Sequence, residues 1–245
     1  MAGVANDSLE IYKDHIKLIL IFSIPFIIAF IIPFLAPLPT YTSAGAIFLR
    51  SASIFANGNI NLVSLAVITI STIFSLLFLS FAFVLISLIV KSKKTHTRIG
   101  RRAFLNIETY IGRVFTIFLA YTILLFIVNI FGYSIGLSAQ LTGIVGFVSF
   151  ALLFYAPSAT VVDDKRLGRA VRDSVVLLFH EPQYFFFWLV LITVVVSIVD
   201  YVSIALFGTP LATYVVLVVN SLFVLPYFVI FQAVTYMLRF KLLRH

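Results

Sequence analysis

Apolar residues occur along this chain in six long runs, and the short stretches between the runs hold nearly all of the charged side chains. A helix needs roughly 20 apolar residues to cross the hydrocarbon core of a bilayer. The pattern predicts an all-α integral membrane protein, a single polytopic domain over 1–245, with six transmembrane helices at about 16–36, 62–90, 109–131, 140–161, 184–207 and 212–238. The fourth run is the weakest because Gly143, Gly146 and Pro157 interrupt it, and Pro226 predicts a kink in the sixth.

Basic residues are confined to one side of this six-helix arrangement. Of the 17 Lys and Arg residues, only Arg50 falls in a connection on the opposite side. The others flank the first span, fill the second and fourth connections and end the chain: Lys13, Lys17, Lys91, Lys93, Lys94, Arg98, Arg101, Arg102, Arg113, Lys165, Arg166, Arg169, Arg172, Arg239, Lys241 and Arg244. Because Lys and Arg favour the cytoplasmic side of membrane helices, this asymmetry predicts cytoplasmic N- and C-termini.

Composition excludes a soluble globular domain. Hydrophobic residues make up 62% of the chain and charged residues 11%, whereas about a quarter of the residues in a soluble domain are charged. The net charge of +8 lies at helix ends, where anionic lipid headgroups attract it, so we expect membrane lipids and no nucleic acid as its partner. The absence of Cys excludes disulfides and Cys-ligated metals, and the low Met count of 2 fits a thermophilic host.

A polar stretch at 163–181 predicts an amphipathic helix on the cytoplasmic side. Asp163 or Asp164 is placed to cap its first turn, and Pro182 ends it. One face carries Leu167, Val171, Val175 and Leu178, and the remaining positions carry Arg166, Arg169, Arg172 and Asp173. A helix of this pattern lies in the plane of the membrane, at the interface.

Two further stretches resemble this one and also precede odd-numbered spans. In the first, Asp7 and Glu10 have capping-box spacing, and the apolar side carries Leu9, Tyr12 and Ile16. The second covers 97–109. We therefore predict three units, each an interfacial helix followed by a transmembrane hairpin, near 7–90, 97–161 and 163–238. The alternative is that the repetition is only topological.

The outer connection at 37–61 is the longest one. Its centre, residues 46–55, is apolar with one Arg and is too short to span a bilayer. It predicts either an interfacial loop held by Phe48 and Phe55 or a lid that folds back on the bundle.

Residues 154–192, FYAPSATVVDDKRLGRAVRDSVVLLFHEPQYFFFWLVLI, combine a Pro-containing helix end, an acidic pair, an amphipathic helix with a Ser and an aromatic-rich span. Pro157, Asp163, Asp164 and Ser174 occupy these places. The segment resembles the multi-span membrane region found with glycerophosphoryl diester phosphodiesterases and related uncharacterised membrane proteins of prokaryotes, of archaeal type. The resemblance implies a helical bundle with interfacial helices in the cell membrane of a prokaryote. It does not imply diesterase activity, because the soluble catalytic domain of that family is absent from this chain.

Motifs for hydrolysis, metal binding and nucleotide binding are missing: there is no H-E-x-x-H, G-x-S-x-G, P-loop or G-x-G-x-x-G pattern. We expect a non-enzymatic protein without catalytic residues, metal or cofactor. The charged group most suited to chemistry would hold a phosphate headgroup, a partner protein or a divalent ion: Asp163, Asp164, Arg166, Arg169 and Arg172. The alternative is a capped surface helix with solvated pairs such as Arg169 to Asp173.

One acidic residue, Asp200, lies inside a span, where an ionisable side chain costs about 2.5–3.5 kcal/mol on insertion scales. Counted from a turn predicted at 208–211, Asp200 and Asn220 fall at similar depth on adjacent spans and are placed to pair. Asn129 and Arg50 would extend this polar cluster in the outer half of the membrane. The cluster would serve as a proton or cation relay or as the floor of a pocket. The alternative is that Asp200 joins helices through hydrogen bonds.

Two functions remain open on these residues. The first is a non-enzymatic multi-pass protein that binds lipid, a membrane partner or a second copy of itself through its basic cytoplasmic face. The second is a small transporter or channel subunit that works through Asp200 and Asn220. The absence of catalytic motifs and the three amphipathic stretches favour the first.

Overall fold

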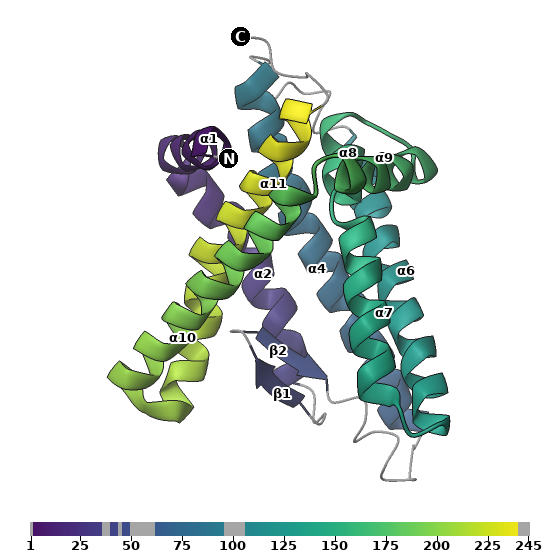
Figure 1. Cartoon of the computed structure of the whole chain (residues 1–245). Helices are drawn as coiled ribbons and strands as arrows, with labels where there is room; N and C mark the ends of the chain where they lie inside the picture. The colour runs from purple at the N-terminus through teal and green to yellow at the C-terminus, as the bar shows by residue number, and fades with distance from the viewer. Residues whose placement is uncertain (1, 36–39, 44–45, 50–61, 96–105, 240–245) are drawn as a thin grey trace.

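A computed structural model describes residues 2–35, 40–43, 46–49, 62–95 and 106–239 of the chain. These residues form a bundle of long helices and one short β-hairpin (Figure 1). Five helices are long and apolar enough to cross a membrane, and α1 with α2 makes a sixth when the two count as one span bent by 93°. Except in its first and last turns, a helix satisfies its backbone polar groups internally, which is the requirement for a chain in hydrocarbon.

Helices occur at all six predicted positions. The helical elements of the described residues, including those between the spans, are in chain order α1 (Ala2–Asp14), α2 (Ile16–Leu35), α4 (Leu62–Thr95), α6 (Ile107–Ser134), α7 (Ser138–Leu153), α8 (Ala156–Val162), α9 (Leu167–His180), α10 (Pro182–Val219), the π-helical turn η1 (Asn220–Val224) and α11 (Leu225–Arg239). Strands β1 (Thr40–Ser43) and β2 (Ala46–Leu49) pair antiparallel and lie in the long connection between α2 and α4. Arg50 and Phe55, which the sequence places there, lie outside the described residues.

Three interruptions shape the long helices. The fourth predicted span breaks at 154–155, directly before Pro157 in the first turn of α8. In α10 the chain reverses at Gly208, whose φ of 72° and ψ of 164° are conformations that only glycine adopts readily, so the predicted turn is confirmed. Pro226 cannot donate a backbone hydrogen bond, and the π-helical turn η1 directly precedes it, with the Leu225 N–H bonded to the Asn220 carbonyl.

Successive long helices pack as hairpins, α2 on α4 and α6 on α7. The second member of each hairpin lies deeper in the bundle. In α4, in 140–162 and in 211–238, 56% of the residues in the most apolar 18-residue stretch are buried. In α6 and in 182–209 only 11% of the residues in that stretch are buried. The outer surfaces of α6 and α10 therefore present apolar side chains such as Phe131 and Val190 to the surroundings.

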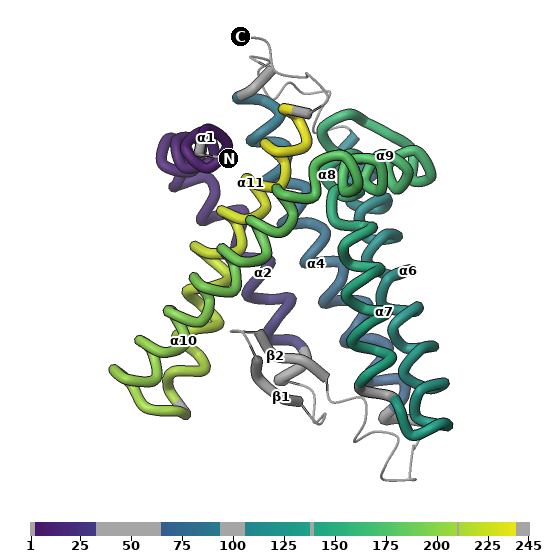
Figure 2. The backbone as a smooth tube through the Cα atoms, viewed as in Figure 1, coloured from purple at the N-terminus to yellow at the C-terminus, as the bar shows by residue number. Residues whose placement is uncertain are grey.

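Helix α1 lies across the end of the bundle, and Figure 2 shows α8 and α9 at that same end. The buried face of α1 carries Val4, Ser8 and Ile11 and packs against α11. The predicted apolar side is wrong, since Leu9 and Ile16 are exposed. The capping box is also wrong, because α1 begins at Ala2 and its polar residues at 7 and 10 fall inside the helix.

Helix α9 forms where the amphipathic pattern predicts it, but it is rotated from the expected orientation. Its buried residues are Ala170, Ser174 and Leu177, whereas the predicted face of Leu167, Val171, Val175 and Leu178 is only half-buried. Two of these three residues, Ala170 and Ser174, are small, which allows close packing of α9 against α7 and α8. Of the remaining interfacial stretch, 96–105 lies outside the described residues, and α6 begins at Ile107.

Candidate functional site

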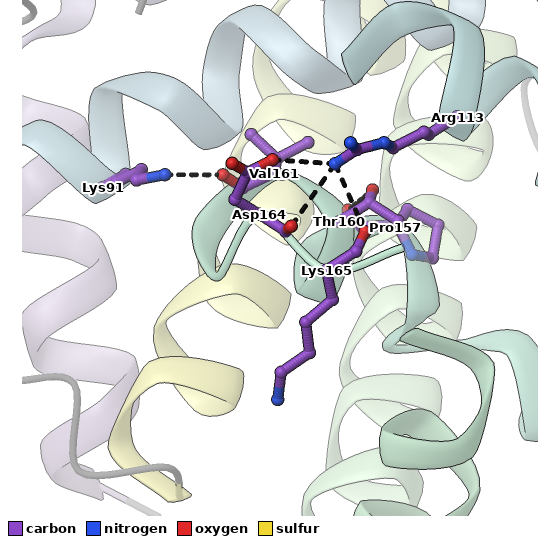
Figure 3. Close-up of polar contacts among 7 residues, drawn as sticks. All are labelled: Lys91, Arg113, Pro157, Thr160, Val161, Asp164 and Lys165. Carbon is purple, nitrogen blue, oxygen red and sulfur yellow. Dashed lines mark hydrogen bonds and ion pairs between the residues drawn. The ribbon is translucent and has the colours of Figure 1, made fainter. Parts of the chain in front are cut away.

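The polar residues of the bundle concentrate around the connector between α8 and α9, residues 163–166. Side chains from two long helices hold the end of α8 and this connector (Figure 3). The Lys91 amine of α4 donates to the Val161 carbonyl at 3.0 Å, which satisfies one of the free carbonyls at the end of α8. The Arg113 guanidinium of α6 donates to the Asp164 carboxylate at 2.7 Å and to the Asp164 and Lys165 carbonyls at 3.4 Å.

Asp164 adopts a left-handed backbone conformation, with φ of 51°, at the point where the chain turns from α8 into α9. This conformation is unfavourable for a residue with a side chain, though Asp tolerates it better than most. Two bonds from Arg113 hold the backbone carbonyl and the carboxylate of Asp164, and the third holds the carbonyl of Lys165. The prediction that the acidic pair caps α9 is wrong, because the N-cap residue is Arg166 and no side chain bonds to the free N–H groups there.

Lys165 lies at the centre of a second group of contacts. Its amine is 2.7 Å from the Asp163 carboxylate and 3.2 Å from the Tyr236 hydroxyl, and it also bonds the Asp173 carboxylate of α9. Burial acts to lower the pKa of the Lys165 amine, but the bonds to Asp163, Asp173 and Tyr236 outweigh it and raise that pKa above its ordinary value. Lys165 therefore stays charged and ties the connector to α9 and α11.

The three arginines of the predicted charged group are placed differently. Arg166, Arg169 and Arg172, here called the arginine row, are exposed and recur every third residue, so they follow one side of α9. Within the described part of the chain, none of them forms an ion pair or a hydrogen bond. The predicted pair of Arg169 with Asp173 is wrong, because Asp173 bonds Lys165 instead. The acidic residues thus form ion pairs within the protein, whereas the three arginines are available to bind another molecule.

Helix α9 is also joined to the break between α7 and α8. The Ser174 hydroxyl donates to the Leu152 carbonyl at 2.7 Å and accepts from the Tyr155 N–H at 2.9 Å. The Gln232 amide of α11 donates to the Phe154 carbonyl. Side chains from two other helices therefore satisfy backbone groups that the break frees, and they fix α9 relative to the bundle.

The predicted intramembrane cluster does not form among the described residues. The amide nitrogen and oxygen of Asn220 are buried and have no hydrogen-bond partner within the described ranges, which include Asp200, so the predicted pair with Asp200 is wrong. Asp200 is half-exposed on α10. Asn129 of α6 donates instead to the Thr142 hydroxyl of α7 at 3.4 Å. Figure 1 shows α10, which carries Asp200, diverging from α6 and α7 at the end away from α9.

Sequence reasoning missed the roles of Lys91, Arg113, Ser174 and Gln232. Lys91 and Arg113 count among the basic residues that flank spans, and that rule does not distinguish a headgroup contact from a bond to a neighbouring helix end. Gln232 does carry a signal, since a polar amide inside an apolar run points to an interhelical bond.

The described residues contain no group of three or more His, Cys, Asp or Glu side chains that could hold a metal ion. In comparisons with known proteins, no family model, no curated protein and no solved structure matches this chain. The resemblance of residues 154–192 to the phosphodiesterase-associated membrane region stays a prediction.

Proposed function

We propose that this chain is a non-enzymatic multi-pass membrane protein that binds the phosphate headgroup of anionic lipids through the arginine row of α9. The observation that carries the proposal is the contrast within one charged segment. Asp163, Asp164, Lys165 and Asp173 are occupied by contacts inside the bundle, while Arg166, Arg169 and Arg172 are exposed and form none in the described part of the chain. An exposed row of arginines without acidic partners is an anion-binding surface.

The chemistry of arginine supports phosphate as the anion. Guanidinium groups bind phosphate through two parallel hydrogen bonds. Each basic residue near an anionic membrane surface contributes about 1 kcal/mol to binding. Val176 and Phe179 are also exposed on this side of α9, with Phe179 72% exposed. Basic residues beside an exposed aromatic side chain are typical of helices that lie at the membrane interface.

The proposal places the end of the bundle that carries α1 and α9 in the cytoplasm of a prokaryotic cell, at its cell membrane. The concentration of basic residues at this end supports that orientation through the positive-inside rule. The stripe of Val4, Ser8 and Ile11 in α1 has the same spacing as Ala170, Ser174 and Leu177 in α9, which supports a structural repeat of the first and third units. In both units a long helix follows directly, at Ile16 and at Pro182.

Native mass spectrometry of the protein released gently from its own membrane tests the proposal. Wild-type protein is expected to retain anionic lipid, and Arg169→Gln/Arg172→Gln is expected to lose it. The matched control is Lys13→Gln/Lys17→Gln, which removes two exposed positive charges, one in the last turn of α1 and one in the first turn of α2, and is expected to keep the lipid. A wild-type protein that carries no lipid overturns the proposal. So does a retained protein subunit that only the arginine variant loses, since that result identifies a protein partner.

A second candidate function is transport through the region of Asp200 and Asn220. The observation in its favour is that the Asn220 amide and the Ser221 hydroxyl are buried in the π-helical turn and have no hydrogen-bond partner in the part of the chain that the structure describes. Such turns frequently occur at functional sites. Proton and cation flux in liposomes tests it. Asp200→Asn is expected to abolish any flux without unfolding the protein, and an unchanged flux excludes the relay.

A further inference from the structure

An apolar cavity of about 220 Å³ lies inside the bundle below α9. Its walls come from α4, α6, α7, α8, α10 and α11, and its lining is mostly aromatic: Phe83, Phe118, Tyr121, Phe150, Phe154 and Trp188. Phe154 belongs to the break between α7 and α8, where Ser174 of α9 bonds the neighbouring backbone. Ser174 thus joins the helix that carries the arginine row to the segment that lines the cavity.

The polar groups in the lining already have partners. The Tyr121 hydroxyl donates to the Gly146 carbonyl at 3.3 Å, the Gln232 amide to the Phe154 carbonyl, and the Trp188 ring N–H to the Phe228 carbonyl at 3.2 Å. No lining side chain in the described part of the chain is left with a buried unpartnered polar atom. A cavity of this kind excludes water, which needs polar partners, and accepts apolar molecules.

The size and position of the cavity select among apolar occupants. Its volume lies below the roughly 300–1,000 Å³ of sites for drug-sized ligands, so it suits one narrow chain. Several lining residues, among them Leu79, Phe118 and Leu153, are only half-buried, so the cavity is not sealed by them. Figure 1 shows α7 and α10 converging toward α9, and the cavity lies where they meet.

We propose that this cavity takes one hydrocarbon chain of the anionic lipid whose phosphate the arginine row binds. The inference rests on the proposed function and adds the site of the lipid chain to it. The arginines of α9 supply the charge that holds the phosphate, and the aromatic walls below α9 supply the apolar surface that a chain buries. Binding both parts gives the site a preference for a two-part, amphipathic ligand over free phosphate.

Trp188 provides a direct test, because it is the single Trp in the chain and it lines the cavity. Bromine atoms quench indole fluorescence on contact. Phospholipids brominated along their chains, with either an anionic or a zwitterionic headgroup, are titrated into the full-length protein in detergent while Trp188 emission is recorded. We expect saturable quenching by the anionic lipid and weaker quenching by the zwitterionic one.

Two variants separate the cavity from the outer surface. Leu79→Phe enlarges a lining residue of α4, and Leu77→Phe is the same change at an exposed position of the same helix, outside the lining. Leu79→Phe is expected to lose most of the quenching while native mass spectrometry still detects bound anionic lipid. Leu77→Phe is expected to keep both. A thermal unfolding curve for each variant confirms that it is folded, and Leu153→Phe replaces Leu79→Phe if the latter is not.

Each outcome assigns a failure to one of the two proposals. If Leu79→Phe binds lipid and quenches like the wild type, the cavity does not hold the chain, and the arginine proposal stands. If wild-type protein binds no anionic lipid by mass spectrometry, the proposed function fails and this inference fails with it. If saturating inorganic phosphate leaves the quenching of Trp188 by the anionic lipid unchanged, the chain binds independently of its phosphate, and the single-lipid assignment is overturned.

Discussion

Ser8 of α1 and Ser174 of α9 occupy equivalent places but make different hydrogen bonds. Each is fully buried at the centre of a three-residue contact stripe, and each precedes the next long helix by eight positions. The Ser8 hydroxyl donates to the Val4 carbonyl at 2.7 Å, within its own helix. The Ser174 hydroxyl bonds the backbone on both sides of the break between α7 and α8. The same position in the two units thus stabilises different contacts.

This difference predicts unequal effects of removing the two hydroxyls. Ser174→Ala leaves the buried Tyr155 N–H without its partner, so we expect it to lower the free energy of unfolding by about 1–3 kcal/mol. Ser8→Ala removes a bond to a carbonyl inside a helix, and we expect a change below about 0.5 kcal/mol. Thermal unfolding in one detergent compares the pair. Equal losses in the two variants contradict the role of Ser174 at the break.

Lys165 provides a second test of how the connector is held. Its side chain is 23% exposed, and those of Asp163 and Asp173 are 28% and 21% exposed. Lys165→Met leaves two carboxylates without their cation. Because the site is partly exposed to solvent, we expect the free energy of unfolding to fall by about 2 kcal/mol, less than the 3–5 kcal/mol for breaking a fully buried pair. The control is Lys93→Met, which removes a pair with Asp14 that is about 40% exposed on both sides, so we expect the unfolding temperature to change much less than in Lys165→Met. A stable Lys165→Met protein shows that the connector is held by other contacts.

The raised pKa of Lys165 gives this stabilisation a defined pH dependence. In the folded state the pKa lies above the ordinary value of 10.5, so the charged form is favoured by folding. The contribution is fully present below pH 10.5 and is lost as the pH rises through the folded pKa. We therefore expect the difference in unfolding temperature between wild type and Lys165→Met to be constant from neutral pH to about pH 10 and to narrow above it. A difference that narrows on the acidic side of neutrality, with no change above about pH 10, contradicts the assignment to Lys165.

Gly208 is predicted to be essential for the reversal between the two halves of the last hairpin. Its φ and ψ are nearly inaccessible to other residues. We therefore expect Gly208→Ala to lower the free energy of unfolding by about 1–3 kcal/mol, although a Cβ at this position would contact no neighbouring atom. Gly143→Ala is the matched control, because Gly143 lies in α7 with open space around it and the substitution should be neutral or stabilising by up to about 1 kcal/mol. If both variants unfold at the wild-type temperature, the reversal does not depend on the conformation of Gly208.

The positions of the long helices are predictable from the sequence because one physical requirement decides them. Apolar runs long enough to cross a bilayer must be helical, so the ends of α2, α4 and α6 fall close to the predicted ends. The turn at Gly208 follows from the same counting, since two spans need a reversal between them. The break at 154–155 divides the weakest predicted span, ahead of its Pro157.

The contact faces and ion pairs are not predictable in this way. Helix α9 has apolar residues on several sides, and packing against α7 and α8 selects Ala170 and Ser174 because small side chains allow close approach. Asp173 has positive neighbours in α9 itself, but its actual partner, Lys165, lies in the connector. The position of the Asn220 side chain depends on the π-helical turn before Pro226, and the sequence predicts only a kink there.

The affinity of the arginine row for anionic lipid tests the central claim most directly. The measurement is the ratio of dissociation constants for a zwitterionic and an anionic phospholipid of identical chains, determined by native mass spectrometry for wild type and for Arg166→Gln/Arg169→Gln/Arg172→Gln. Three arginines at about 1 kcal/mol each predict that the ratio falls by roughly 100-fold in the variant. A ratio that is the same in both proteins, with the variant folded, contradicts the assignment of α9 as the lipid-headgroup site.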